Sequence, residues 1–294
     1  MALKAALDRS VRAMCEPVLI GSRAVLAAHG RVPKHLLVVE TPEREFEVGE
    51  IRPEHGLAAL DAARLAIEGA LGGKYRAVVA APHSETAIRA AGVDFDGYPS
   101  FVARCAGLQP EDGILMLCFA HEGRELRIAH VTLHSGVRDA VALVSAERVL
   151  KTIRAAHATL KQMRIPAPKI AVGGLNPHAS GKEEETVIGP AIERARQEKI
   201  AADGPIGADT LIQRPGYDAY VVMLHDQGHI AAKLLAPNRA AALTIGTPVL
   251  FSSVAHGAAF DIAGRNRADP SAMVEAITRV ASRRRRARAT AKAD

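Results

Sequence analysis

Apolar runs of strand length alternate along the chain with longer segments in which apolar residues recur every three to four positions. This recurrence marks one helix face within residues 57–71 and another within 149–163. Strand-like runs are expected at 17–20, 36–40, 76–81, 114–120, 126–133, 169–174, 218–224, 240–245 and 248–252. Strands that alternate with helices of roughly 10–20 residues predict an α/β fold with a largely parallel sheet and flanking helices.

Further helices are expected at 2–14 and 183–199, and a last one is expected to begin near Pro270. Ser145 is a candidate N-cap, because its side chain can accept a hydrogen bond from the first helical turn. Residues 203–210, which contain Gly-Pro and a second glycine, predict a loop.

The loop at 108–113 is a candidate domain boundary, because it combines proline, glycine and acidic residues between two apolar segments. The first domain is expected to comprise residues 1–107 and 268–294, with a basic disordered tail at 283–294. The second is expected to comprise residues 108–267.

Charge and cysteine content narrow the functional class. The net charge is +6, and residues 279–294 alone contain seven basic residues and one acid, so the rest of the chain sums to zero. A basic tail without aromatic residues favours a solvated end over a nucleic-acid or membrane surface. The three cysteines show no C-x-x-C spacing, and no apolar run is long enough to cross a bilayer. The first 17 residues carry charges throughout and contain no continuous apolar segment, so they are not expected to act as a signal peptide. A cytoplasmic protein is expected.

Three of the strand-like runs end on a histidine beside glycine, proline or asparagine: His134, His178 and His225. Polar residues at the carboxyl ends of parallel strands mark the usual position of an α/β active site. In the last case His225, Asp226, Gln227 and His229 fall within five residues. We therefore expect the three strand ends to converge on one divalent metal. Asp209 and Asp226 are candidate acceptors for imidazole N–H groups.

Spacing alone leaves open that these three histidines are ordinary surface or core residues. Ligands about 45 residues apart form no local metal signature. An all-imidazole site suits Zn, Co, Ni or Fe better than Mg. The remaining histidines without polar company are expected to be surface or satisfied core residues: His29, His35, His55, His83, His121, His130 and His157. The glycine-rich stretch at 173–181 could hold an anion, but neither a G-x-G-x-x-G fingerprint nor a P-loop occurs.

Several motifs, in this order, resemble the 4-hydroxythreonine-4-phosphate dehydrogenase family over nearly the whole chain. They are VTLHSGVRDA (131–140), GLNPHAS (174–180), GADT (207–210), LHDQGHIAAK (224–233) and SVAHGAAFDIAG (253–264). Residues 256–270 also resemble the adenosine-binding loop of the isocitrate and isopropylmalate dehydrogenases, which share the fold.

The resemblance implies a homodimer of two-domain subunits that acts on a small hydroxy acid with NAD or NADP and a divalent metal. His134, His178 and His225 match the family's metal ligands, one of which, expected to be His225, comes from the partner subunit. Lys233 and Asp209 match catalytic, substrate-side residues, and Arg138 is a further candidate substrate contact. The expected cofactor contacts are His256, Gly257, Ala258, Asp261 and Asn266.

Departures from the family pattern concern the substrate phosphate and the N-terminus. Tyr98 stands where the family has a phosphate-contacting histidine, and Phe251 stands where it has an arginine. Ala242 replaces an asparagine and Glu85 a lysine. A phosphate dianion would lose most of its donors, so Tyr98 and Phe251 predict contacts with a less charged substrate end. The family's opening strand and its G-D-P-x-G-I-G-P-E turn have no counterpart in this sequence.

The resulting hypothesis is a metal- and NAD(P)-dependent dehydrogenase that oxidises a secondary alcohol near a carboxylate, with decarboxylation of the β-keto acid. A carboxylated cis-dihydrodiol is the expected kind of substrate. Two alternatives stay open. One is a genuine 4-hydroxythreonine-4-phosphate dehydrogenase of pyridoxal phosphate synthesis. The other is a non-catalytic binding protein that lacks the N-terminal cofactor turn.

Overall fold

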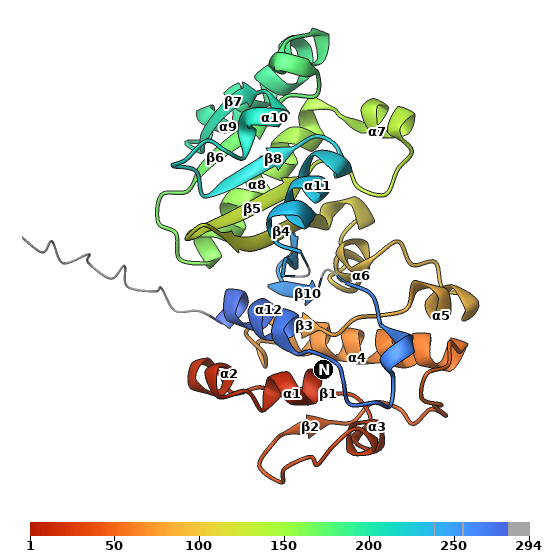
Figure 1. The fold of residues 1–294 in the computed structure, drawn as a ribbon. Coiled ribbons are helices and arrows are strands. Elements are labelled where there is room, and N and C mark those ends of the chain that lie inside the picture. The colour runs from red at the N-terminus through yellow and green to blue at the C-terminus, as the bar shows by residue number, and fades with distance from the viewer. Residues whose placement is uncertain (238, 255, 282–294) are drawn as a thin grey trace, which may run out of the picture.

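The computed structural model describes residues 1–237, 239–254 and 256–281. Within these residues, eight strands form one long sheet in the order β3-β10-β9-β4-β5-β8-β6-β7 (Figure 1). The bounds are β3 Val78–Ala80, β4 Ile114–His121, β5 Arg124–His130, β6 Lys169–Gly173, β7 Ala201–Ile206, β8 Ala219–Val222, β9 Ala241–Ile245 and β10 Phe251–Val254.

Parallel pairing dominates the half of the sheet that carries the candidate histidines. Strands β5, β8, β6 and β7 are parallel neighbours, and β3 and β10 form another parallel pair. The three antiparallel pairs, β10 with β9, β9 with β4 and β4 with β5, lie between these groups. The predicted α/β fold with a mostly parallel sheet is confirmed.

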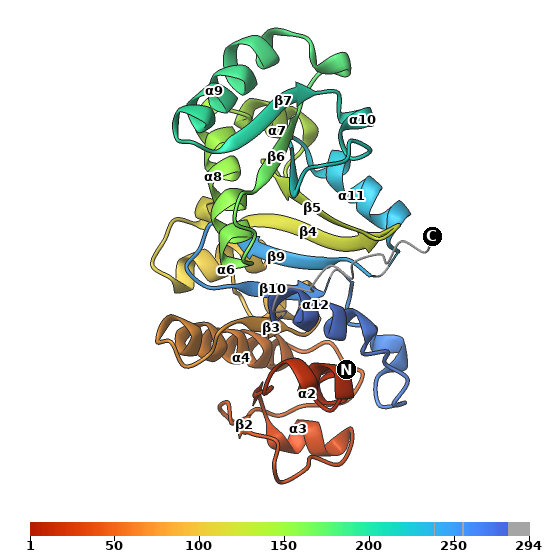
Figure 2. The same ribbon diagram turned by 90° about the vertical axis from the view of Figure 1, so that its left-hand side faces the viewer.

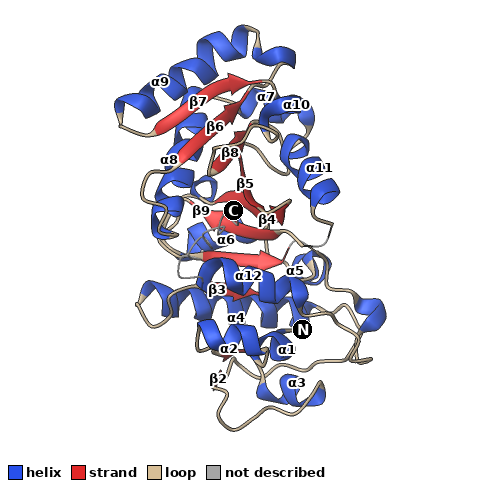
Figure 3. Cartoon of the chain, turned by 60° about the vertical axis from the view of Figure 1, so that its left-hand side comes forward, coloured by secondary structure: helices blue, strands red, loops and turns tan. Residues whose placement is uncertain are grey.

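Helices cover both faces of the sheet, which is why its strands are apolar on both sides. In β8, Ala219 and Val221 belong to one core cluster, whereas Tyr220 and Val222 belong to another. Helices α8 (Ala146–Gln162) and α9 (Gly189–Gln197) lie over the first face, and α11 (His225–Leu235) lies over the second (Figures 2 and 3). Ser145 accepts a hydrogen bond from Arg148 N, which confirms the predicted cap.

The N-terminal part adds a separate parallel pair, β1 (Leu19–Ile20) with β2 (Val38–Val39). The single helix predicted for 2–14 is wrong. Helix α1 (Ala2–Ala6) ends, and α2 (Arg9–Met14) begins after Asp8, whose carboxylate accepts hydrogen bonds from Ser10 N and Val11 N. An aspartate that caps a new helix cannot lie inside the old one.

The loop predicted for 203–210 is also wrong, because the structure has a strand and a short helix there. Strand β7 includes Gly204 and Pro205, and α10 (Ala208–Leu211) follows. Strand β7 lies at the end of the sheet and pairs only with β6 among the described residues. An edge strand tolerates proline, because it needs hydrogen-bond partners on one side only.

The remaining elements connect these layers. The other helices are α3 Arg23–Ala28, α4 Pro53–Leu71, α5 Glu85–Ala90, α6 Tyr98–Cys105, α7 Val137–Leu143 and α12 Ser271–Ala281. Short 3-10 turns lie at Pro110–Asp112, Pro177–Ala179 and Phe260–Ile262, and a π-helical turn lies at Glu184–Ile188. No helix of the described residues is long and apolar enough to cross a bilayer.

Two predictions concern the limits of domains. The main sheet contains strands from both sides of the proposed boundary between residues 107 and 108, and the division into two domains stays a prediction. The predicted tail at 283–294 lies outside the described residues. Arg279 is one of the seven basic residues counted at 279–294. It belongs to α12, where it is buried and pairs with Glu275.

Candidate active site

The three candidate histidines follow three neighbouring parallel strands. His134 follows β5, His225 is the first residue of α11 after β8, and His178 lies in the 3-10 turn after β6. The sheet order β5-β8-β6 places the carboxyl ends of these strands side by side at one edge. The three strand ends therefore lie side by side as expected, and their convergence on one metal stays a prediction.

His134 and His225 form the closest pair of candidate ligands. Their ring centroids lie 5.7 Å apart, and His134 is exposed while His225 is half-buried. The Nδ1 of His225 lies 2.6 Å from the Asp226 carboxylate, which confirms the predicted role of Asp226 as an imidazole partner. A carboxylate at Nδ1 leaves Nε2 as the nitrogen available to a metal.

Two further histidines continue this row beneath the surface. The ring of His229 stacks on His225 with centroids 3.7 Å apart, and His130 lies 4.8 Å from His229. His130 is 1% exposed and its Nδ1 lies 3.3 Å from Leu115 O. Burial, with a smaller contribution from His229, lowers the pKa of His130 to about 3. Burial is also the main cause that lowers the pKa of His229 to about 4.

The expectation of a surface or satisfied core residue is wrong for His130. Its Nε2 is buried and has no hydrogen-bond partner among the described residues. The sequence contains one signal for this arrangement, because Gly228 on α11 provides the space into which Nε2 points. A Cβ at Gly228 would overlap with the His130 ring.

Gln227, which the sequence analysis gave no role, joins the loops that carry His225 and His178. Its Oε1 accepts hydrogen bonds from Met223 N (2.9 Å) and Leu224 N (3.0 Å), and its Nε2 donates to Gly174 O (3.1 Å). Thr132 Oγ1 donates to Met223 O (2.7 Å), which ties the end of β5 to the same point. The three strand ends are thus locked together by side chains as well as by the sheet.

The segment that carries His178 is held by a buried carboxylate. Glu184 Oε1 accepts hydrogen bonds from Leu175 N (2.7 Å) and Asn176 N (2.8 Å), and Oε2 accepts from Asn176 Nδ2 (2.8 Å). His178 adopts a left-handed backbone conformation with φ 61°, which costs a non-glycine residue about 1–3 kcal/mol. Such strain persists where surrounding contacts enforce it. Helix α10, which carries the exposed Asp209, packs against this turn.

The described residues bring two of the candidate ligands together but not all three. Among the described residues, no group of three His, Cys, Asp or Glu side chains is placed to hold a metal ion. The imidazole pair of His134 and His225 fits two ligands of a site for Zn, Co, Ni or Fe. His178, the third candidate ligand, is not placed with this pair in the described part of the chain.

Two cationic candidate residues lie on the helices that follow His134 and begin at His225. Lys233 is exposed on α11, eight residues after His225, and contributes to the lowered pKa of His229, whose largest cause is burial. Arg138 is exposed on α7, four residues after His134. Both side chains are exposed, and their contact with a substrate stays a prediction.

The candidate cofactor residues lie on an exposed loop after β10. Gly257, Ala258, Asp261 and Asn266 are exposed, and His256 is half-buried. Lys4 of α1 anchors the loop by donating to Asn266 O (2.8 Å) and Ala268 O (3.1 Å). The exposed side chains of Asp261 and Asn266 have polar groups of the kind that hydrogen-bond to the hydroxyl groups of a nucleotide.

Tyr98 and Phe251 lie deeper than a direct substrate contact would suggest. Phe251 is 0% exposed and Tyr98 is 6% exposed, and their ring centroids are 5.0 Å apart. His83, after β3, packs edge-on against Tyr98 at 4.6 Å. Burial lowers the pKa of His83. His83, expected to lack polar company, also lies 4.0 Å from the exposed Glu85 carboxylate. The predicted contact of Tyr98 and Phe251 with a substrate stays a prediction.

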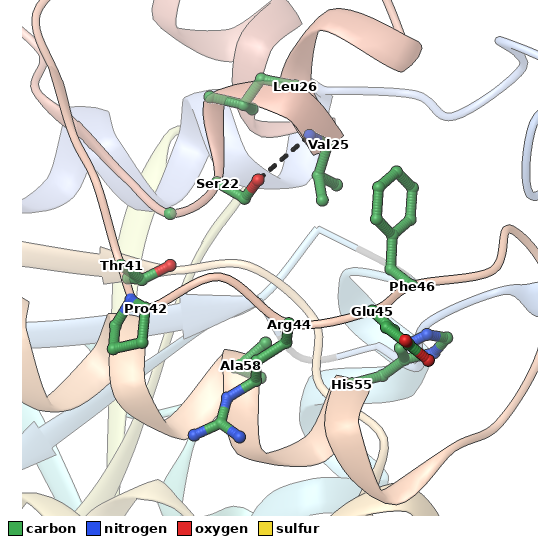
Figure 4. Close-up of a pocket in the computed structure, with 12 residues that line it drawn as sticks. Ser22, Val25, Leu26, Thr41, Pro42, Arg44, Glu45, Phe46, His55 and Ala58 are labelled. Atoms are coloured by element: carbon green, nitrogen blue, oxygen red, sulfur yellow. Dashed lines mark hydrogen bonds between the residues drawn. The ribbon is translucent and has the colours of Figure 1, made fainter.

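A small cavity of about 220 Å³ lies elsewhere, in the N-terminal part (Figure 4). Its wall includes Ser22, Phe46 and His55. The His55 ring is engaged by the backbone, since Nε2 accepts from Glu47 N and Nδ1 lies 3.0 Å from Glu50 O. None of the candidate site residues lines this cavity.

Comparison with known proteins identifies the family. Residues 7–280 match the family described as pyridoxal phosphate biosynthetic protein PdxA. The chain belongs to the PdxA family. Members of this family are named as dehydrogenases, among them 4-hydroxythreonine-4-phosphate dehydrogenases, so the suspected resemblance is confirmed.

Individual PdxA relatives differ in their named substrates. The chain is 47% identical, over 78% of its length and 73% of the relative's, to a 1,2-dihydroxy-3,5-cyclohexadiene-1,4-dicarboxylate dehydrogenase of Comamonas sp.. It is 36% identical to a D-threonate 4-phosphate dehydrogenase of Cupriavidus necator, over 94% of this chain and 90% of the relative.

Solved PdxA-family structures share the fold. A terephthalate 1,2-cis-dihydrodiol dehydrogenase from Burkholderia xenovorans is 38% identical with a TM-score of 0.73, over 95% of this chain and 93% of that one. A 4-hydroxythreonine-4-phosphate dehydrogenase from Klebsiella pneumoniae gives 0.78 at 27% identity over the same shares. The chain therefore has the isocitrate dehydrogenase-like fold.

Proposed function

We propose that this chain is a metal- and NAD(P)-dependent dehydrogenase that oxidises an unphosphorylated, carboxylated cis-dihydrodiol. The observation that carries the proposal is the aromatic contact between Tyr98 and Phe251, which are buried at positions where the resemblance places phosphate contacts of the family. The half-buried ring of His83 packs against Tyr98. The relatives named for a cyclohexadiene dicarboxylate and for a terephthalate dihydrodiol support the same substrate class.

His134 and His225 would hold a divalent metal (Zn, Co, Ni, Fe or Mg), with His178 as the third ligand. When bound there, the metal supplies a positive charge that lowers the pKa of a coordinated alcohol. The exposed loop with His256, Gly257, Ala258, Asp261 and Asn266 would hold the adenosine part of the nicotinamide cofactor, which accepts the hydride.

The chain's own residues would then fix the substrate. Lys233 and Arg138 provide two positive charges for a dicarboxylate, with Lys233 acting as a mobile point charge. Asp209 would orient a substrate hydroxyl from the α10 side. Oxidation of the hydroxyl beside a carboxylate-bearing carbon gives a β-keto acid, which loses CO2, and Lys233 would neutralise the negative charge that remains. The aromatic cluster around Tyr98 would exclude water on the ring side.

We also propose a homodimer whose subunits share the active site. Helices α7 and α11, which adjoin His134 and His225, expose large apolar side chains: Val137 (73%), Val141 (38%), Leu143 (40%), Ile230 (56%) and Leu234 (77%). We take these five side chains together as the candidate contact surface, the apolar patch, because exposed apolar surface is typical of protein contacts. Because His225 pairs with His134 of its own chain, we assign the ligand contributed across the dimer to His178 rather than to His225.

Substrate competition tests the function. Reduction of NAD⁺ and NADP⁺ is followed with the terephthalate cis-dihydrodiol, 4-phosphohydroxythreonine and D-threonate 4-phosphate, before and after chelation and metal add-back. We expect turnover of the dihydrodiol, loss of activity on chelation, and loss in His225→Ala but not in His157→Ala, a histidine on α8. Preference for a phosphorylated substrate would instead support pyridoxal phosphate synthesis, and cofactor binding without hydride transfer would support a binding protein.

A further inference from the structure

His229 lies beside the candidate metal ligands without being one of them. Its ring is parallel to that of His225, with an interplanar angle of 10° and centroids 3.7 Å apart. Its Nδ1 lies 3.2 Å from His225 O, so it donates to the first carbonyl of helix α11. The ring therefore presents its face, rather than a nitrogen, to His225.

The position of His225 explains why such a neighbour matters. His225 is the first residue of α11, so no preceding helical turn packs against its side chain. The Asp226 carboxylate restrains Nδ1, but one hydrogen bond leaves the imidazole free to pivot about that contact. Residues four apart lie on one helix face, so His229 covers one side of the ring and limits that rotation.

His229 is itself supported from below. The His130 ring lies 4.8 Å from it and is fully buried between β5 and α11. Gly228 lets the helix approach His130 closely, because any Cβ there would overlap with the His130 ring. This contact between Gly228 and His130 determines how closely α11 packs on β5, and therefore where His229 lies.

We propose that His229 is a positioning residue, which holds the imidazole plane of His225 by stacking so that Nε2 faces His134. This inference rests on the proposed function, since His225 matters as a metal ligand only there. It assigns to His229 no bond to metal or substrate. An aromatic ring at position 229 should therefore be sufficient to hold His225, even if it contains no nitrogen.

Cobalt binding tests this without any enzymatic assay. The full-length protein is titrated with Co²⁺ against a competing chelator, and the visible absorption of the bound ion is recorded for the wild type, His229→Phe, His229→Ala and His225→Ala. Loss of a residue that orients a ligand typically weakens metal affinity by about 10–100-fold. We expect a loss of that size in His229→Ala and an affinity within about threefold of wild type in His229→Phe.

Other outcomes separate the inference from the proposed function. Equal affinity in wild type and His229→Ala, with binding abolished in His225→Ala, would overturn the positioning role alone. Failure of His229→Phe to bind Co²⁺ would also overturn it, because a nitrogen of His229 would then be required. Wild type that binds no better than His225→Ala would overturn the metal site itself. If His229→Ala melts early, His229→Gln, which also lacks a ring but keeps a polar side chain, replaces it in the comparison.

Discussion

Glu184 illustrates how one buried side chain can fix a segment of the active site. It is 4% exposed, and its carboxylate accepts three hydrogen bonds from Leu175 and Asn176. Burial alone would raise its pKa, but these hydrogen bonds more than offset that effect, and the pKa of Glu184 is lowered. The ionised form is thus the one that holds the left-handed turn at His178.

Replacement of Glu184 by glutamine should loosen this turn. The amide keeps one acceptor oxygen and turns an NH2 group toward donors, which leaves buried N–H groups unpaired at a cost of about 1–3 kcal/mol. Urea unfolding should show a loss of this size in Glu184→Gln. The matched control is Glu185→Gln, at the exposed next position. Equal unfolding free energies in the two variants would contradict the role of Glu184.

His130 predicts how stability depends on pH. Its folded-state pKa of about 3 lies below the usual value of 6.5, so the unfolded chain binds the proton more tightly. The free energy of unfolding is therefore not reduced by His130 above pH 6.5. It decreases as pH falls from 6.5 towards 3, by at most about 1.4 kcal/mol per pH unit. The free energy of unfolding of His130→Leu should fall less steeply between pH 6.5 and 5 than that of wild type. His35→Leu, at an exposed position, should keep the wild-type slope; an unchanged slope in His130→Leu would exclude His130 as its source.

At the scale of elements, the site depends on how closely helix α11 approaches strand β5. Its apolar underside includes the buried Ala232, and Gly228 removes the side chain that would hold the helix away from His130. Gln227 then connects the start of α11 to the loop after β6. The contacts of α11 with β5 and with the loop after β6 therefore determine where His225 and His229 lie.

Helix propensity and packing predict opposite effects at Gly228. Alanine is favoured over glycine within a helix by about 1 kcal/mol. The overlap with His130 should nevertheless make Gly228→Ala destabilising, by about 1–3 kcal/mol as for other overpacked cores. In a double-mutant cycle, the same change in a His130→Ala background should cost much less or stabilise the protein. Additive effects in the cycle would show that the two residues do not constrain each other.

The sequence predicts strands and helices whose apolar pattern is local. It does not predict features that form only when distant segments pack together. Apolar runs located β5, β6 and β8, and therefore the edge where His134, His178 and His225 emerge. Periodicity could not reveal β7, because Gly204 and Pro205 resemble a loop unless the strand is known to lie at an edge. Nor could it reveal the stack of His130, His229 and His225, which forms only when α11 packs on β5. The sequence marks Tyr98 and Phe251 as departures from the family pattern, but their burial follows only from the fold.

At the scale of the whole molecule, the proposed metal site and the apolar patch on α7 and α11 both favour a dimer. Among the described residues, His134 and His225 lie close together without a third ligand, and the helices α7 and α11 that adjoin them expose large apolar side chains. A second chain would cover the patch and supply the missing ligand. Assembly and metal binding should therefore be lost together.

Charge introduced into the patch should separate the subunits. We expect the double variant Val137→Glu and Leu234→Glu to sediment as a monomer and to lose high-affinity Co²⁺ binding, because burying two carboxylates in an apolar contact is costly. Ile51→Glu, an equally drastic change at another exposed apolar position, should leave the dimer intact. A dimer that survives the double variant would exclude this surface as the interface.

The most direct test of the central claim, a metal site shared between subunits, is complementation between inactive variants. His134→Ala and His178→Ala are coexpressed, and dihydrodiol-dependent reduction of the nicotinamide cofactor is measured. If His134 and His225 come from one chain and His178 from the other, half of the dimers are mixed and one of their two sites is intact, so activity should return to about a quarter of wild type. The pair His134→Ala with His225→Ala should stay inactive. Recovery in that second pair, or in neither pair, would contradict the shared site proposed here.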